Sequence, residues 1–421
     1  MHERDEPVVD HSGLATLSGT NTGASSGKTT PSSVFGVFLV FLRLGLTSFG
    51  GPIAHLGYLR TEFVERRKWL KEAAYADLVA LCQFLPGPAS SQVGIALGAL
   101  RAGLPGALAA WCGFTLPSAA IMIAFGYGLR FFPLMSAAGW LGGLKIAAVA
   151  VVAQAVWGMG RQFCRDRLRA TFAILAAMIV LAWTSPLAQI SVIALGAIAG
   201  RYLLPAGQIV PEEHEQFGVS RRGSVAAWVV FFVLLALLPA AAGVIRSHAL
   251  DLFDSFFRTG ALVFGGGHVV LPLLRAQVVP RGWVNDSDFL AGYGVAQALP
   301  GPLFSFAAYL GTVKNASPDG WRGGLLALTA IFLPAFLLVF GALPHWNAWR
   351  RQPAIRAAFD GINAVVVGIL LAALYDPIFR SAVHGPVDLV LVLAAFGMLA
   401  YWRVSPVWVV IFAALSGIVR G

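Results

Sequence analysis

Residues 83–91 read Gln83-Phe84-Leu85-Pro86-Gly87-Pro88-Ala89-Ser90-Ser91, and long apolar segments lie on both sides of them. Pro86 and Pro88 lack backbone N–H donors and clash with the preceding turn, so a continuous helix cannot pass through this stretch. In a bilayer, unpaired backbone groups persist only where protein buries them or where they line a water-filled cavity. A break of this kind inside an apolar segment therefore predicts a binding site.

The same pattern recurs in the second half of the chain. Residues 297–305 read Gln297-Ala298-Leu299-Pro300-Gly301-Pro302-Leu303-Phe304-Ser305, so the glutamine, both prolines and the glycine repeat in register, and Ser305 corresponds to Ser91. An earlier signature repeats as well, because Phe49-Gly50-Gly51 corresponds to Phe264-Gly265-Gly266. Duplicated halves that each contain a broken apolar helix are typical of secondary transporters, whose substrate sites lie at the repeat interface.

The composition indicates a membrane protein. Hydrophobic residues make up 57% and charged residues 12% of the 421 residues, and the mean hydropathy is +0.74, whereas soluble proteins carry roughly 25% charged residues. The net charge of +10 does not indicate nucleic-acid binding, since basic residues in short loops are the usual cytoplasmic anchors of apolar spans. The cysteines show no C-x-x-C spacing, so we expect no metal site, no disulfide framework and no cofactor.

We therefore expect an all-α polytopic membrane protein made of two homologous halves, arranged as inverted repeats with broken helices at the repeat interface. The predicted organisation is a disordered polar tail at 1–33, a first repeat at 34–204, a polar connection with a single linking helix at 205–246, and a second repeat at 247–421. If each half crosses the membrane six times, the linking helix inverts the second half and the total is about thirteen crossings.

The distribution of basic residues supports this inversion only in part. The basic stretch at 60–71 is reduced in its counterpart at 275–285, as the positive-inside rule requires of an inverted repeat. The arginines at 161–169, however, fall on the wrong side unless the broken segment re-enters the membrane instead of crossing it. The sequence leaves both topologies open.

Two arginines inside apolar spans are candidate anion ligands. A charge in that position costs roughly 3 kcal/mol or more unless it is paired or hydrated, and Arg43 and Arg258 occupy corresponding places in the two halves. For Arg258 the alternative is a structural ion pair with Asp254, one helical turn earlier. Arg43 has Leu39 at that place, so local pairing does not explain it.

The helix breaks supply most of the other candidate ligands. A half-helix that starts after a glycine or proline presents free amides and a positive dipole end, and serine and glutamine side chains add donors without a fixed charge. The alternative is that both breaks are ordinary kinks capped by these side chains. The predicted substrate-binding set is Arg43, Gly50, Gly51, Gln83, Pro86, Gly87, Ser90, Ser91, Lys145, Arg258, Gly265, Gly266, His268, Gln297, Gly301 and Ser305.

Lys145 is included because it lies in the middle of an apolar segment whose counterpart has Asn363. It either contacts the substrate or a coupling ion, or it snorkels or loses its proton. Isolated ionisable residues near segment ends, such as His55 and Asp77, are expected at the membrane interface, with proton transfer as the alternative.

The motifs Phe41-Leu42-Arg43-Leu44-Gly45, Phe49-Gly50-Gly51-Pro52 and Cys82-Gln83 through Gln92-Val93-Gly94 closely resemble those of the chromate ion transporter family. The resemblance extends over residues 34–421, and the paired motifs match the family's long-chain, two-domain bacterial members. It implies a multi-pass protein of the bacterial inner (plasma) membrane that exports chromate from the cytoplasm and confers chromate resistance. The second half departs from the first at Gly267-His268 and at Asn363, so we expect the halves to contribute unequally.

The membrane potential alone can drive such export, because a dianion leaving a negative interior gains roughly 4.6 kcal/mol per 100 mV. The alternative function is a general sulfate-like oxyanion carrier, for which sulfate would compete, since the two dianions share shape and charge. An enzyme is not expected, because neither an H-E-x-x-H motif nor a nucleophile and base pattern is present. The other expected partner is the lipid bilayer, and a homodimer stays open.

Overall fold

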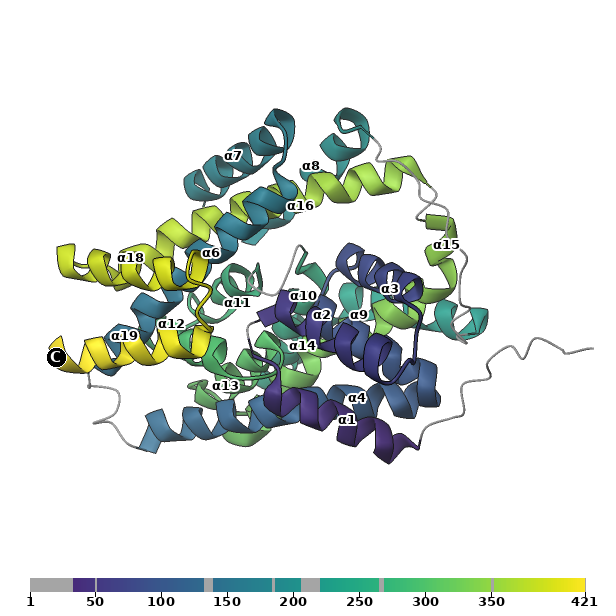
Figure 1. Ribbon diagram of the computed structural model, residues 1–421, viewed down its shortest axis with the longest axis horizontal. Helices are drawn as coiled ribbons and strands as arrows, with labels where there is room; N and C mark the ends of the chain where they lie inside the picture. Colours follow the sequence, from purple (N-terminus) through teal and green to yellow (C-terminus); the bar gives the residue numbers. More distant parts are fainter. Residues whose placement is uncertain are drawn as a thin grey trace, which may run out of the picture. The chain divides into compact units, whose positions relative to one another are not determined.

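The computed structural model describes residues 33–49, 51–131, 139–183, 186–205, 220–264, 269–349 and 352–420. The predicted tail, apart from Ser33, and residues 206–219 of the predicted polar connection lie outside these residues. The described residues contain helices and no strands, as predicted (Figure 1). Five of the helical segments are long and apolar enough to cross a membrane, and they are Ala89–Phe131, Trp140–Phe163, Arg221–Ile245, Gly320–His345 and Pro353–Ala382.

The helices follow one another in two corresponding series. The first half contains α1 (Val34–Thr47), α2 (Gly51–Arg60) continued by the π-helical turn η1 (Thr61–Arg66), α3 (Glu72–Phe84), α4 (Ala89–Phe131), α6 (Trp140–Phe163), α7 (Arg167–Ala182) and α8 (Pro186–Leu203). The linking helix is α9 (Arg221–Ile245). The second half contains α10 (His248–Leu262), α11 (Val270–Val278), α12 (Asp286–Ala298), η3 (Leu303–Ser305), α13 (Phe306–Val313), α14 (Gly320–Ala342), η4 (Leu343–His345), α15 (Trp346–Trp349), α16 (Pro353–Ala373), η5 (Leu374–Phe379), α17 (Arg380–Ala382), α18 (Pro386–Ala400) and α19 (Pro406–Arg420).

Several helices begin at a polar residue that accepts a hydrogen bond from the first helical turn. Ser33 accepts from the amide of Gly36 at the start of α1, and Ser220 accepts from Gly223 at the start of α9. Asp166 and Asn285 cap α7 and α12 in the same way. Each cap satisfies one of the amides that the helix itself leaves without an acceptor.

Helix α4 consists of two helices joined by a sharp bend. The backbone leaves the helical region at Ala102 and at Gly103, where φ is +60°. Beyond the bend the chain folds back so closely that a Cβ on Gly98 would lie 2.3 Å from the carbonyl oxygen of Gly106. We call residues 89–101 α4a and residues 104–131 α4b. The corresponding helices of the second half are α13 and α14, which are separate.

Each broken segment is a re-entrant hairpin. The guanidinium of Arg101, at the end of α4a, lies 4.7 Å from the ring centroid of Trp69, which precedes α3. In the second half, the ammonium of Lys314 lies 4.8 Å from the ring centroid of Trp283. The start and end of each segment therefore lie together, as they do in a hairpin. This arrangement favours the re-entrant alternative over six crossings per half.

The two halves are inverted relative to each other, as predicted. The corresponding helices α4b and α14 run antiparallel, since Arg130 near the end of α4b forms an ion pair with Asp319 at the start of α14. Further along the pair, the ring of Trp111 lies 5.6 Å from that of Phe332. The first hairpin therefore inserts at one end of α4b and the second at the other.

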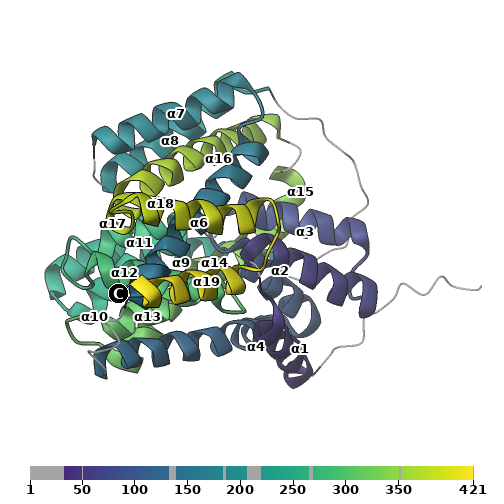
Figure 2. The same cartoon turned by 60° about the vertical axis from the view of Figure 1, so that its left-hand side comes forward.

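The remaining helices pack crosswise between the halves. Helix α16 of the second half lies against α7 and α8 of the first, and α6 of the first half lies against α18 and α19 of the second (Figures 1 and 2). Gly200 packs on the backbone of Ala357, and Gly143 packs on that of Ala413. Helix α6 and helix α16 therefore each pack against helices of the other half, so the two repeats form one fold.

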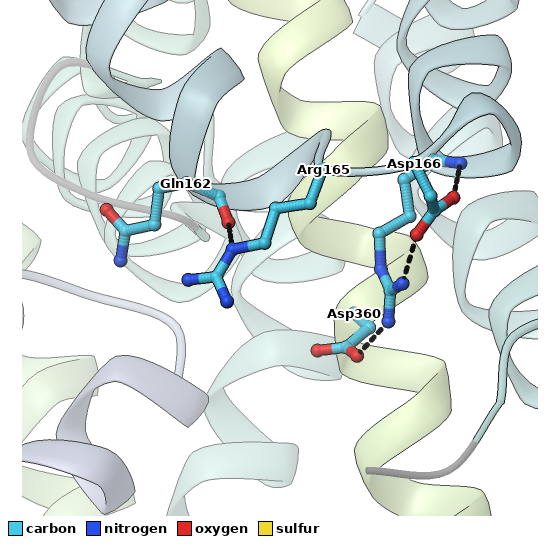
Figure 3. Close-up of polar contacts among 5 residues, drawn as sticks. Gln162, Arg165, Asp166 and Asp360 are labelled. Atoms are coloured by element: carbon cyan, nitrogen blue, oxygen red, sulfur yellow. Dashed lines mark hydrogen bonds and ion pairs between the residues drawn. The ribbon is translucent and has the colours of Figure 1, made fainter.

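One of these crossed contacts carries an ion-pair bridge, shown in Figure 3. Arg169 of α7 donates to Asp360 of α16 at 2.6 Å and also pairs with Asp166. The backbone amide and the guanidinium of Arg169 lower the pKa of Asp166. The bridge joins the first turn of α7 to the second turn of α16, where the ring of Phe359 lies 3.5 Å from that of Phe84 at the end of α3.

Candidate functional site

The helix breaks of one half are bonded to the helix ends of the other. The amide of Gly87 donates to the carbonyl oxygen of Val263 at 2.6 Å, and the amide of Gly301 donates to the carbonyl oxygen of Ser48 at 3.0 Å. Ser48 and Val263 are the corresponding residues that follow α1 and α10. The two bonds are therefore reciprocal, and they bring the breaks together across the repeat interface as the sequence predicts.

Glycine is required at both Pro-Gly-Pro breaks (residues 85–88 and 299–302). Gly87 has φ +123° and Gly301 has φ +94°, a region that residues with a side chain rarely adopt. A Cβ on Gly301 would lie 2.9 Å from the hydroxyl oxygen of Ser118 and 3.1 Å from the carbonyl oxygen of Phe114. Each break thus lies closely packed against the helix pair α4b and α14.

The helices that start after the breaks present anion donors. Helices α4a and η3–α13 begin immediately after the prolines, and the first amides of a helix have no acceptor within it. In η3 the amide of Ser305 already donates to the carbonyl oxygen of Pro302 at 3.0 Å, which leaves those of Leu303 and Phe304. Ser90, Ser91 and Ser305 lie in these first turns and are buried, with 3%, 3% and 1% exposure. Among the described residues the Ser91 hydroxyl has no hydrogen-bond partner. Free amides, hydroxyls and positive dipole ends together suit an oxyanion.

His55 is a further polar residue at this interface, and the sequence analysis assigned it only to a segment end. Its Nε2 lies 3.1 Å from the Ser48 carbonyl oxygen that also accepts from Gly301. A carbonyl only accepts, so Nε2 carries the hydrogen in this contact. Within the described part of the chain Nδ1 has no partner, although the residue is buried. The only sequence signal that places His55 at this interface is its position in the turns that follow Gly50-Gly51.

Gln92 was not predicted as a site residue either. Its amide Nε2 donates to the carbonyl oxygen of Pro86 at 2.8 Å, which satisfies a backbone group that the break leaves free. The side chain is fully buried, and its Oε1 has no partner among the described residues. Gln92 therefore holds the first break in shape, and it follows directly after the predicted run of residues.

The two candidate arginines have different surroundings. Arg258 forms an ion pair with the buried Asp254, so the structural alternative is present for this residue. Arg43 is exposed and lies close enough to Glu62 for a favourable charge interaction. Glu62 also pairs with Arg66 and Arg67 at 3.0 and 2.7 Å. Each arginine thus lies near one carboxylate, which comes from α10 in the second half and from η1 in the first.

The remaining predicted residues are distributed unevenly. Gln297 is buried and hydrogen-bonded to Tyr293, whereas the corresponding Gln83 is exposed on α3. Lys145 is half-buried on α6 and has no ion pair within the described residues. Pro86 is buried within the first break, and Gly51 begins α2. Four predicted positions lie outside the described residues: Gly50, Gly265, Gly266 and His268.

Comparison with known proteins gives a consistent result. The family model described as Chromate transporter matches residues 35–201 and 250–418, which leaves out the segment that contains α9. A chromate transport protein of Cupriavidus metallidurans is 28% identical over 94% of this chain and 96% of its own length. One of Pseudomonas aeruginosa is 29% identical over 92% of each chain. The uncharacterized transporter YwrA of Bacillus subtilis is 33% identical over 29% of this chain and 68% of its own length. No solved structure matches.

Proposed function

Because the chain belongs to the chromate transporter family, we propose that it carries chromate out of the cytoplasm and binds it at the paired helix breaks. The observation that supports this site is the reciprocal bonding of Gly87 to Val263 and of Gly301 to Ser48. It brings the free first-turn amides of α4a and η3–α13 to the repeat interface. A tetrahedral dianion can accept hydrogen bonds from several directions at once, which matches donors contributed by two inverted halves.

Positive charge for the dianion comes from Arg43 and Arg258 in this proposal. Each lies five residues before the helix end that is bonded to the opposite break, which is about 7 Å along a helix axis. Neighbouring carboxylates reduce this charge, since Arg258 pairs with Asp254 and Arg43 interacts with Glu62. Incomplete neutralisation suits transport, because a substrate that is held too tightly is released too slowly. Lys145 is the third cationic residue in the proposed set of ligands. Because the second half has Asn363 at the corresponding position, Lys145 gives the first half one more positive charge in this set.

The distribution of basic residues supports an orientation. With re-entrant hairpins, the base of the first hairpin, the start of α7, the end of α8 and the starts of α9 and α16 all lie on one side. Basic residues are concentrated there: Arg60, Arg66, Arg67, Lys68, Lys71, Arg101, Arg161, Arg165, Arg167, Arg169, Arg201, Arg221, Arg222 and Arg356. The opposite side has fewer: Arg130, Arg246, Arg275, Arg281, Lys314, Arg322 and Arg380. By the positive-inside rule the first side is cytoplasmic, and we place the protein in the inner membrane of a bacterium.

The membrane potential supplies the driving force in this proposal. A dianion that leaves a cell with a negative interior gains about 4.6 kcal/mol per 100 mV, twice the value for a single charge. A coupling ion is then not required, and export lowers the cytoplasmic chromate concentration, which gives resistance.

The test is chromate uptake into everted inner-membrane vesicles at a set membrane potential, with and without excess sulfate. Uptake that rises with an interior-positive potential and resists sulfate is the expected result. Uptake strongly inhibited by the excess sulfate would indicate a general oxyanion carrier, and uptake independent of potential would refute electrogenic export. Arg43→Ala and Arg43→Lys proteins of equal abundance test the site, because an unchanged apparent affinity for chromate in both would exclude contact with Arg43.

A further inference from the structure

An apolar cavity lies between the linking helix α9 and the helix pair α4 and α14. Its volume is about 630 Å³, and the side chains that line it include Leu104, Trp111, Ala227, Phe336 and Phe340. Leu104 is 55% exposed, so the cavity is open along one wall. Since no charged residue lines it, the cavity does not suit a dianion. It is separate from the predicted set of substrate ligands, none of which lines it.

The cavity has the depth of one leaflet of a bilayer. Along α14 and η4 its lining runs from Leu343 back to Thr329, which corresponds to about 21 Å of helix. Half of a bilayer, headgroup region included, measures about 20–22 Å. Leu343 and the bend near Gly103 lie on the side where the first hairpin inserts, so the cavity reaches from that surface to about the middle of the membrane.

Basic residues are adjacent in sequence to the residues that line the end of the cavity at this surface. Ser220 and Gly223 of α9 line the cavity, and the two residues between them, Arg221 and Arg222, are exposed. Neither arginine has an ion pair with another residue that the structure describes. Arg101 follows the lining residue Leu100 and lies over the ring of Trp69. An apolar slot with long, exposed arginine side chains next to its end is complementary to a molecule with an apolar tail and an anionic head.

We propose that this cavity binds one acyl chain of an anionic phospholipid, whose phosphate headgroup lies against Arg221 and Arg222. The assignment of the lipid to the cytoplasmic leaflet rests on the orientation proposed above, whereas the binding itself does not depend on transport. The bound chain fills the space between α9 and the α4–α14 pair, and it thereby attaches the linking helix to both inverted halves.

Native mass spectrometry of the full-length protein in detergent, titrated with phosphatidylglycerol or with phosphatidylcholine of the same acyl chains, tests the proposal. Wild-type protein should retain one phosphatidylglycerol with higher affinity than phosphatidylcholine. Ala227→Phe fills the cavity and should weaken phosphatidylglycerol binding by about tenfold or more, because the chain loses its buried contacts. The matched control is Val230→Phe on the same helix, where the side chain is 43% exposed and does not line the cavity; its binding should equal that of wild type.

The double variant Arg221→Gln, Arg222→Gln changes only exposed side chains, so it tests the headgroup contact even if Ala227→Phe fails to fold. It should lower the affinity for phosphatidylglycerol to that for phosphatidylcholine. Equal affinity of the wild-type protein for the two lipids would overturn the anionic headgroup assignment. Unchanged binding in Ala227→Phe, or no bound lipid in the wild type, would overturn the cavity as the site. These readouts contain no chromate, so their failure is distinguishable from failure of the transport proposal.

Discussion

Replacing Gly301 by alanine should disrupt the second Pro-Gly-Pro break and with it the reciprocal bond to Ser48. The added Cβ would meet the Ser118 hydroxyl oxygen at 2.9 Å and the Phe114 carbonyl oxygen at 3.1 Å, and φ at this position is +94°. A carbonyl oxygen inside helix α4b cannot move aside without bending that helix. The substitution therefore acts on the geometry of the proposed binding site as well as on stability.

The expected cost follows from these two effects. A residue held in an unfavourable backbone region costs about 1–3 kcal/mol, and overpacking a filled site costs about 1–3 kcal/mol. Gly301→Ala should therefore destabilise the protein by about 2–6 kcal/mol. Gly87→Ala should cost less, because its nearest neighbour, at 2.8 Å, is the amide end of the Gln92 side chain, which can rotate away. Gln92 would then give up its hydrogen bond to Pro86.

The assay combines thermal unfolding in detergent with chromate uptake per molecule in vesicles. Gly158→Ala is the control, because Gly158 lies in α6 with no atom near its virtual Cβ; its melting temperature and uptake should match those of the wild type. We expect Gly301→Ala to lose about tenfold or more of its uptake, since small displacements of binding groups have large effects on rate. A Gly301→Ala protein that melts and transports like Gly158→Ala would refute the reasoning from the break.

Gln297→Ala should lower chromate uptake by about threefold or more while Gln83→Ala leaves it within about twofold, because only Gln297 is buried and hydrogen-bonded; equal effects in paired vesicle assays would contradict this. Arg43→Leu should raise the apparent KM for chromate more than Arg43→Lys does, since lysine keeps the charge. Equal KM values for the two variants in initial-rate measurements would show that the charge is irrelevant. The Arg130 guanidinium lowers the pKa of Asp319, so their ion pair stabilises the fold above the usual aspartate pKa of about 3.9 and is lost as the pH falls below it. Because both side chains are largely exposed, Asp319→Asn should cost about 1 kcal/mol or less at pH 7, which melting curves between pH 3 and pH 7 can measure; a larger loss at pH 7 than at pH 3 would confirm the sign.

Sequence reasoning identified the features of the fold that depend on local chemistry. The prolines at 86 and 88 and their counterparts predicted the breaks, and the register of the repeat predicted two homologous halves. It could not decide whether a broken segment crosses or re-enters, since a hairpin and a kinked span have the same apolar composition. The contact between Arg101 and Trp69 favours re-entry, and it depends on residues more than thirty positions apart.

The sequence predicted the helix breaks of the candidate site, but not the contacts that several side chains make around them. Gln83 and Gln297 correspond in sequence, yet only Gln297 is buried, because burial depends on which helix of the other half packs against each segment. The proximity of Glu62 to Arg43 could not be predicted, since the two lie on different helices and Glu62 has no acidic counterpart in the second half. His55 was placed at a segment end because hydropathy gives no sign that α2 turns back toward Ser48. These contacts arise from packing between helices, which a local sequence pattern does not predict.

The crossed packing of α6 and α16 also constrains how such a protein is made and how it arose. When the ribosome has completed the first half, α7 and α8 are already in the membrane but their packing partner α16 does not yet exist, so the nascent first half has to persist without its final neighbours. A chain that contained a single repeat would face the same situation permanently. It could complete this architecture only by associating with a second chain inserted in the opposite direction. Fusion of the two repeats through a helix such as α9 makes this association intramolecular.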